Sequence, residues 1–242
     1  MHLLVTRPDE DAGSLVELLA EMGHEAVSAP LMEIRLQRDA KIPDTPYQAI
    51  LITSANGARA IGERLEIARL SNIPVLAVGG ASAEASREAG FLDVEAAGGD
   101  VTSLVDLALR RLEPGAGPLL HAAGSVVAGD LKGDLEARGF SVDRVILYEA
   151  VAAERMPEAA SEALKSETLS GVLLYSPRTA RIFSALVREA GLEDTLRPLA
   201  AYCLSQAVAE ALAGLPFARV HVAREPSQAA LLELLEPEFR PG

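Results

Sequence analysis

Two similar stretches, LITSANGARAI (51–61) and LLYSPRTARIF (173–183), decide the fold. Each begins as a short apolar run, reaches a Ser, passes through a turn that contains Gly or Pro, and continues as a helical pattern rich in Ala and Arg. A buried strand that leads directly into a helix is the building block of α/β proteins with parallel sheets. Because Ser54 and Ser176 stand at equivalent points, at an offset of 122 residues, the pattern predicts an internal repeat.

The surrounding sequence extends this repeat. Residues 2–33 match residues 118–149 at an offset of 116, and residues 75–97 match residues 199–223 at an offset of 126. The chain therefore has the order A-B-A-B, in which B contains the strand-to-helix junction. Apolar runs typical of strands occur at 3–6, 49–53, 75–79, 93–97, 119–123, 145–149, 171–176, 199–203 and 219–223.

The lengths of the connections indicate which copies share a sheet. The first B joins the second A through the short segment 113–118, whereas the A-to-B connections, 31–46 and 149–170, are much longer. We therefore expect an inserted, five-stranded domain over residues 36–149, and a discontinuous terminal domain formed by residues 1–35 and 150–242. Two sequential domains divided near residue 115 are the alternative.

Composition narrows the range of partners. The formal charge is −13, aromatic residues make up 4% of the chain and Trp is absent, so neither a basic surface nor a stacking platform for nucleic acid is expected. The N-terminus lacks a basic and then apolar signal sequence, and no apolar run of about 18 residues follows, which favours a cytoplasmic protein without a membrane segment. The four His residues have no metal-ligand spacing, and Cys203 lies in an apolar run typical of a buried thiol. We predict no metal.

The carboxyl ends of the predicted strands carry Ser, Thr, Asn and Gly just before each helix. These residue types are ordinary N-caps, and each is more often structural than functional. Together they place several helix N-termini on the rims of two sheets, where free N–H groups favour anions. Arg7 and Arg178 are the cations best placed to assist. Neither a Ser–His constellation, a GxSxG elbow, a P-loop nor a GxGxxG fingerprint occurs, so we expect a cofactor-free site that binds and positions its ligand.

Five motifs together resemble the uroporphyrinogen-III synthase family: LLVTRP (3–8), ITSANGARA (52–60), LAVGGASAEA (76–85), LKGDLEARGFSV (131–142) with LYEA (147–150), and YSPRTA (175–180). They occur in the family's order over residues 3–235. The resemblance implies two flavodoxin-like, doubly wound parallel-sheet domains, joined by a two-stranded ladder of LMEIRLQ (31–37) and VILYEAV (145–151), the first domain being discontinuous. It also implies a cyclising lyase of porphyrin, tetrapyrrole and heme biosynthesis. Such an enzyme converts hydroxymethylbilane to uroporphyrinogen III, with loss of water and inversion of the last pyrrole ring, and uses no cofactor.

The resemblance assigns roles to particular residues. Tyr148, on the second ladder strand, is the candidate general acid for the loss of hydroxide, with a substrate-ordering role as the alternative. The expected substrate-binding positions are Arg7, Ser54, Asn56, Gly57, Gly79, Gly80, Ser82, Thr102, Ser103, Ser176, Pro177, Arg178, Ser205, Gln206 and Ser227. The chain departs from the family in the turn at 205–208, where a Gly-Pro-Thr-Thr-like sequence is common, and in the loop after LLHAAG (119–124), where Lys132 is the only cation in place of an Arg.

The long and polar connections between the domains predict a monomer with a loose hinge, and the resemblance implies that it acts on a small linear tetrapyrrole. A transient contact with the enzyme that makes hydroxymethylbilane is a further expectation. Two other hypotheses remain open from the residues alone. One is a two-domain anion-binding module without catalysis. The other is a duplicated flavodoxin-like regulatory module, for which Asp9 and Asp100 are the nearest candidate acidic residues.

Overall fold

The computed structural model describes residues 1–127 and 129–236; residues 237–242, the end of the expected terminal domain, lie outside the described part. The chain divides into two compact units. Unit 1 consists of Met1–Glu33 and Val151–Gly242, and unit 2 consists of Ile34–Ala150. In the described residues no helix is long and apolar enough to cross a membrane.

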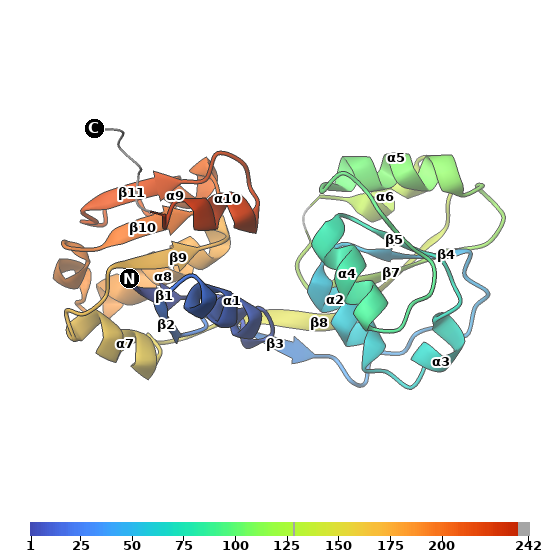
Figure 1. Ribbon diagram of the computed structural model, residues 1–242. Helices are drawn as coiled ribbons and strands as arrows, with labels where there is room; N and C mark the ends of the chain where they lie inside the picture. Colours follow the sequence, from blue (N-terminus) through green and yellow to red (C-terminus); the bar gives the residue numbers. More distant parts are fainter. Residues whose placement is uncertain (128, 237–242) are drawn as a thin grey trace. The chain divides into compact units, whose positions relative to one another are not determined.

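Unit 1 contains a five-stranded sheet in the order β11-β10-β9-β1-β2, in which neighbouring strands pair in parallel (Figure 1). Its strands are β1 (His2–Val5), β2 (Glu25–Ser28), β9 (Gly171–Leu174), β10 (Ala200–Cys203) and β11 (Arg219–Val222). Its helices are α1 (Asp9–Glu21), α7 (Glu158–Lys165), α8 (Pro177–Glu189), α9 (Gln206–Glu210) and α10 (Gln228–Glu233), with a 3-10 turn at Glu193–Leu196.

Unit 2 contains a six-stranded sheet in the order β3-β8-β7-β4-β5-β6, in which β4 to β8 pair in parallel. Its strands are β3 (Met32–Leu36), β4 (Ala49–Ile52), β5 (Val75–Ala77), β6 (Val94–Ala96), β7 (Leu119–Gly124) and β8 (Val142–Ala152). The first two residues of β3 and the last two residues of β8 are counted in unit 1. Its helices are α2 (Ala55–Gly62), α3 (Ile67–Leu70), α4 (Gly80–Glu88), α5 (Val101–Arg111) and α6 (Leu131–Glu136). The sixth strand corrects the expected five, because the ladder strand β3 joins this sheet beside β8.

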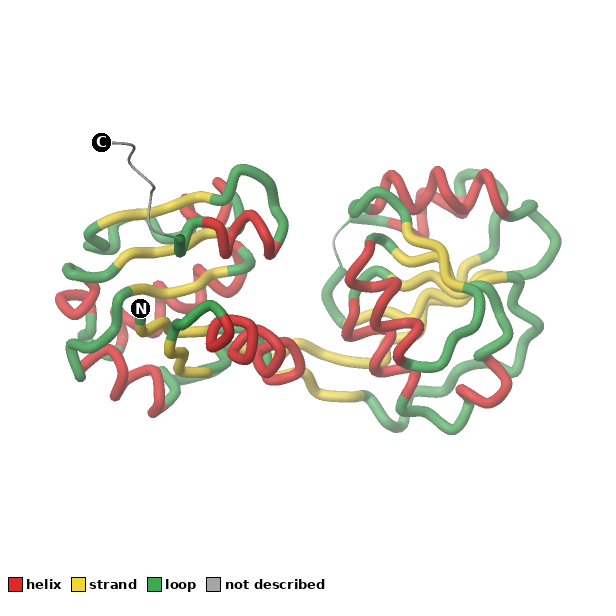
Figure 2. Tube along the Cα trace, in the orientation of Figure 1, coloured by secondary structure: helices red, strands yellow, loops and turns green. Residues whose placement is uncertain are grey.

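The central strands are apolar on both faces because helices cover both faces of each sheet (Figure 2). In β4, Ile50 and Ile52 pack with helices α2 and α4, while Leu51 packs with α5 and α6. In β1, Leu4 belongs to the core under α7 and α8, and its neighbours on the opposite face pack with α1 and α10. Both units are therefore doubly wound, as expected.

The strand registers repeat with the same offsets as the sequence. Leu3 pairs with Ala26 between β1 and β2, and Leu119 pairs with Val142 between β7 and β8, both shifted by 116. The other three strand pairs of unit 1 map in the same way onto unit 2 with the offsets 116, 122 and 126. The copies are therefore similar in strand pairing as well as in sequence.

Strand β2 and Cys203 can each be compared with the expectation from the sequence. The nine apolar runs omit β2, whose pattern EAVS is only partly buried at the edge of its sheet. Cys203 is fully buried in the core of unit 1, and burial raises the pKa of its thiol to about 12, so the interpretation of Cys203 as a structural residue is confirmed.

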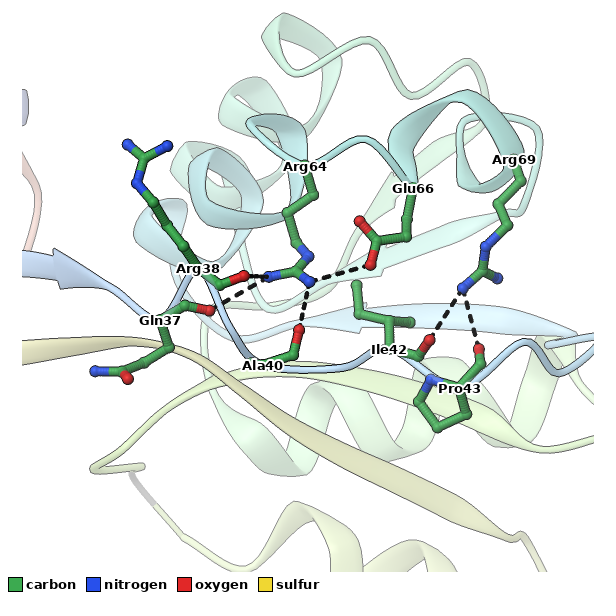
Figure 3. A network of polar contacts seen from close by, with 8 residues as sticks. All are labelled: Gln37, Arg38, Ala40, Ile42, Pro43, Arg64, Glu66 and Arg69. Carbon is green, nitrogen blue, oxygen red and sulfur yellow. Dashed lines mark hydrogen bonds and ion pairs between the residues drawn. The ribbon is translucent and has the colours of Figure 1, made fainter.

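Arginine side chains of unit 2 hold the extended segment that connects β3 to β4 (Figure 3). The guanidinium of Arg64, whose side chain is 12% exposed, donates to the carbonyl oxygens of Gln37 and Ala40 and pairs with Glu66 at 3.0 Å. Arg69 donates in the same way to the carbonyls of Ile42 and Pro43, at 3.2 and 3.1 Å. The backbone of the connection thus finds hydrogen-bond partners without forming regular secondary structure.

Candidate active site

A cavity of about 390 Å³ lies in unit 2 where the parallel strands end. This is the edge of an open α/β sheet at which ligands usually bind. Thr53 and Ser54 follow β4 directly, and Tyr148 comes from β8. The complete lining consists of Thr53, Ser54, Val78, Gly99, Asp100, Val101, Val126, Val127 and Tyr148.

Ser54 and Tyr148 form a hydrogen-bonded pair in the wall of this cavity. The Ser54 Oγ and the Tyr148 hydroxyl oxygen are 2.8 Å apart, and either can donate. Ser54 is also the N-cap of α2, because its Oγ accepts from the backbone N–H of Gly57 at 3.3 Å. Tyr148 is 9% exposed, so its ring is held by packing while its hydroxyl reaches the cavity.

A register shift between β7 and β8 places Tyr148 in this position. Ala123 pairs with Ile146, but the next residue, Gly124, pairs with Tyr148, so β8 carries an extra residue. A Cβ on Gly124 would lie 2.7 Å from the Cζ atom of Tyr148. The strand therefore needs glycine at 124 to admit the aromatic ring.

Thr53 and His121 form a second polar pair behind the cavity. Thr53 Oγ1 and His121 Nε2 are 3.1 Å apart. His121 is 2% exposed, and burial, with a smaller contribution from the charge of Arg144, lowers its pKa to about 4. The imidazole is therefore neutral at pH 7 and contributes hydrogen bonds but no charge.

Arg7 organises a separate cluster in unit 1. Its guanidinium pairs with Asp11 at 2.9 Å, donates to Gln228 at 2.9 Å and lies 4.5 Å from the ring centroid of Tyr175. Burial raises the pKa of Tyr175 to about 12, against the opposing effect of Arg7. Arg7 thus has structural partners, and its availability to a ligand depends on exchanging them.

Most of the other predicted positions lie at helix N-termini, where their hydrogen bonds are those of caps. Ser176 accepts from the backbone of Thr179 at 3.0 Å, and Ser227 accepts from Ala230 at 3.2 Å. Ser103 completes a capping box with Asp100 at the start of α5. The first turns of helices contain Asn56 and Gly57 (α2), Gly80 and Ser82 (α4), Thr102 (α5), Pro177 and Arg178 (α8), and Gln206 (α9), and Gly79 and Ser205 are the N-caps of α4 and α9.

The structure brings together only part of this predicted set. Ser54 and Tyr148 line the cavity of unit 2, whereas Ser82 is 5% exposed within α4. Seven predicted positions, Arg7, Ser176, Pro177, Arg178, Ser205, Gln206 and Ser227, belong to unit 1. Sequence reasoning missed Thr53, His121 and Tyr175; the available signal was their place at the end of, or within, the apolar runs of the repeat.

The side chains around the cavity offer hydroxyl groups for binding and proton donation. Within residues 1–127 and 129–236, no group of three or more His, Cys, Asp or Glu side chains is placed to hold a metal ion. The cavity of unit 2 is lined by the hydroxyl residues Thr53, Ser54 and Tyr148, by Asp100, and by Gly and Val residues. Such a site can accept hydrogen bonds from a ligand, donate them to its oxygen atoms, and exclude water from part of its surface.

Comparisons with known proteins agree on one family. The chain is similar to the porphyrin biosynthesis protein HemD of Ruminiclostridium josui, with 27% identity over 227 residues that cover 86% of this chain and 43% of that protein. The chain thus spans less than half the length of this curated relative.

Two crystal structures share the fold. Uroporphyrinogen-III synthetase from Helicobacter pylori 26695 matches with a TM-score of 0.68 and 18% identity, with 97% of each chain covered. A mutant uroporphyrinogen-III synthase from the extremely thermophilic bacterium Thermus thermophilus matches with a TM-score of 0.52 and 18% identity over the same shares. The family pattern described as uroporphyrinogen-III synthase HemD matches residues 13–233, which include parts of both units, and the chain belongs to this family.

Proposed function

We propose that the chain is a uroporphyrinogen-III synthase, a lyase that converts hydroxymethylbilane to uroporphyrinogen III with loss of water, inversion of the last pyrrole ring and closure of the macrocycle. The family match over residues 13–233 is the observation that carries this proposal. The cavity of unit 2, with its row of hydroxyl groups, supports it because the reaction requires proton donation and positioning rather than a nucleophile.

The substrate is a polycarboxylate, although the chain has a net charge of −13. Its binding must therefore depend on local donors. Helices α4, α5 and α8 begin at the carboxyl ends of their sheets, and each N-terminus favours an anion by about 0.3–1 kcal/mol. We propose that such N-termini, together with Arg7 and Arg178, hold the carboxylates.

Tyr148 is the proposed acid. Loss of the terminal hydroxyl as water leaves an azafulvenium ion. The substituted α-carbon of the last pyrrole ring then attacks this electrophile, so that a spiro carbon forms before simple end-to-end closure. The Tyr148 hydroxyl can transfer its proton to the departing hydroxide, and the Ser54 hydroxyl, 2.8 Å away, can stabilise the phenolate that results. The main contribution of the protein is to hold the chain in the geometry that favours the inverted ring.

The location, the oligomeric state and the supply of substrate are part of the same proposal. We propose a cytoplasmic monomer that receives its unstable substrate directly after synthesis, through a transient contact with the enzyme that makes it. The family match gives no support to an anion-binding module without catalysis.

The test is the isomer ratio of the product. Hydroxymethylbilane is generated in situ, the protein is added, and the products are oxidised and separated into type I and type III uroporphyrin. Predominantly type III is expected, because unassisted closure gives the symmetric type I ring. Type I alone, with a folded protein, would contradict the proposal.

A further inference from the structure

Thr53 occupies a distinctive place in the cavity of unit 2. It lies between the last residue of β4 and the N-cap Ser54, and it lines the cavity beside Tyr148. Its hydroxyl is hydrogen-bonded to the ring of His121, which does not line the cavity. The direction of that hydrogen bond decides what Thr53 can offer to a ligand.

The ring of His121 has two different nitrogen environments. Nε2 is 3.1 Å from Thr53 Oγ1, whereas Nδ1 is buried and has no hydrogen-bond partner among the described residues. A neutral imidazole carries its proton on one of these atoms only. If the proton were on Nδ1, a buried N–H donor would remain unsatisfied, and Thr53 would have to donate to Nε2.

Arg144 favours the other tautomer. Strand β7 lies between β4 and β8, and His121 pairs with Leu51 on one side and with Arg144 on the other. The charge of Arg144 acts on the ring of His121, since it contributes to the lowered pKa of the imidazole. A guanidinium at the neighbouring strand position favours a lone pair, and disfavours an N–H, at the ring nitrogen that has no described partner, which is Nδ1.

We infer that His121 carries its proton on Nε2 and donates it to Thr53 Oγ1, which leaves the Thr53 hydroxyl to donate its own proton into the cavity. Thr53 is then a substrate-binding donor to a carboxylate oxygen of the tetrapyrrole, and His121 is a positioning residue that acts through it. The inference rests on the proposed function for the identity of the ligand. The direction of the hydrogen bond rests on the structure of unit 2 alone.

Steady-state kinetics test the role of the Thr53 hydroxyl. Thr53→Val keeps the branched shape but removes the donor, so we expect KM to rise about tenfold with little change in kcat, since one hydrogen bond to a charged group is lost. Thr53→Ser restores the hydroxyl and most of the affinity. Thr195→Val is the matched control, because it removes a hydroxyl that is bonded to the Leu192 carbonyl in unit 1. An unchanged KM in Thr53→Val, or a loss confined to kcat, would overturn the assignment.

The role of His121 is tested by a conservative pair of variants. In His121→Gln the amide N–H can replace the Nε2–H donor, so KM should stay near the wild-type value. His121→Leu has no donor, and its KM should rise about threefold. Equal kinetics in the two variants, with both proteins shown to be folded by circular dichroism, would remove His121 from the positioning of Thr53.

Nitrogen-15 NMR of the histidine rings provides a readout that is independent of activity. The expected spectrum of the wild-type protein at neutral pH shows His121 with a protonated Nε2 and an unprotonated Nδ1. A protonated Nδ1 would overturn the inference even if the protein makes type III product. A wild-type protein that makes only type I product would instead contradict the proposed function. The NMR spectrum would still decide the direction of the hydrogen bond between His121 and Thr53.

Discussion

The hydroxyl of Tyr148 is the single group whose removal tests the proposed chemistry most directly. Tyr148→Phe leaves the ring in the space that Gly124 provides and deletes only the bond to Ser54. We expect kcat to fall by about tenfold to a hundredfold, less than the upper range for the loss of a general acid, because hydroxide leaves this substrate readily. Type III product should still predominate, since positioning is retained. The measurement is the rate of type III formation at saturating hydroxymethylbilane.

Tyr47→Phe is the matched control for that variant. It deletes another phenol oxygen of unit 2, which is bonded to Asp143 at 3.0 Å and does not line the cavity. Its kcat should equal that of the wild-type protein. Complete inactivity of folded Tyr148→Phe would make the phenol indispensable, and full activity would exclude it from the mechanism.

His121 makes the stability of unit 2 depend on pH. Its pKa is lowered from 6.5 to about 4 in the folded chain. Between these values the unfolded chain binds the proton and the folded chain does not, so stability falls as the pH decreases through this window. About pH 5.5 is one unit below the ordinary pKa of a histidine. At this pH the free energy of unfolding should be lower by about 1.4 kcal/mol than at about pH 7.5.

Urea unfolding of wild type and His121→Gln at these two pH values measures the effect. The variant lacks the titrating group, so its free energy of unfolding should decrease less than that of wild type by about 1.4 kcal/mol. Parallel decreases in the two proteins would show that His121 titrates normally in the folded state.

Single residues also show how far the sequence could predict the site. Tyr148 and Ser54 were predicted from motifs, and the structure places them 2.8 Å apart. His121 was passed over, because its function depends on a partner 68 residues away that becomes a neighbour only through the pairing of β4 with β7. Ser176 and Ser227 satisfy the N-cap pattern equally well and have capping bonds in the structure. A cap and a ligand contact have the same local sequence, so the pattern alone could not separate them.

Arg64 is one of the two arginines that hold the segment between β3 and β4. Arg64 holds carbonyl groups of this segment (Figure 3). The backbone N–H of Gln37 in turn donates to the carbonyl oxygen of Leu147, the residue before Tyr148, at 2.7 Å. Arg64→Met removes these donors from a largely buried position. We expect unit 2 to lose about 2 kcal/mol of stability.

Arg38 provides the comparison within the same cluster. Its side chain is 77% exposed, and its only described ion pair, with Glu63, spans 3.4 Å. An exposed pair of this kind contributes about 0–1 kcal/mol, so Arg38→Met should unfold close to the wild-type urea midpoint. If both variants unfold at the same midpoint, Arg64 does not support the segment.

The strands and helices were largely predictable because their signals are local and occur twice. The three sequence offsets reappear in the registers of both sheets, so the repeat that was found in the sequence is also a repeat of the strand pairing. Strand β2 was missed because an edge strand of four partly exposed residues has no apolar run. The pairing of β3 with β8 was expected from the family resemblance, as a two-stranded ladder, and is confirmed by the strand order.

The order of the copies along the chain has a consequence for the molecule as a whole. Unit 2 is continuous, and all of its parallel strands, β4 to β8, are encoded by residues 49–152. Unit 1 depends on β1, which lies between β9 and β2 and contributes the fully buried residues Leu3, Leu4 and Val5. The two units should therefore respond differently when the chain is divided.

We propose that the continuous unit is an independent folding domain, and we expect residues 34–152 to fold when they are expressed alone. Residues 153–242 should remain unfolded, because without β1 the strand β9 loses a parallel neighbour and the apolar faces of α8 and α10 lose part of the core that covers them. Adding residues 1–33 in trans should restore cooperative unfolding, at a concentration that depends on the affinity of the peptide. The measurement is urea unfolding followed by far-ultraviolet circular dichroism. A cooperative transition of residues 153–242 without the peptide would contradict the pairing of the two chain ends in one domain, since the fragment would then carry a complete core of its own.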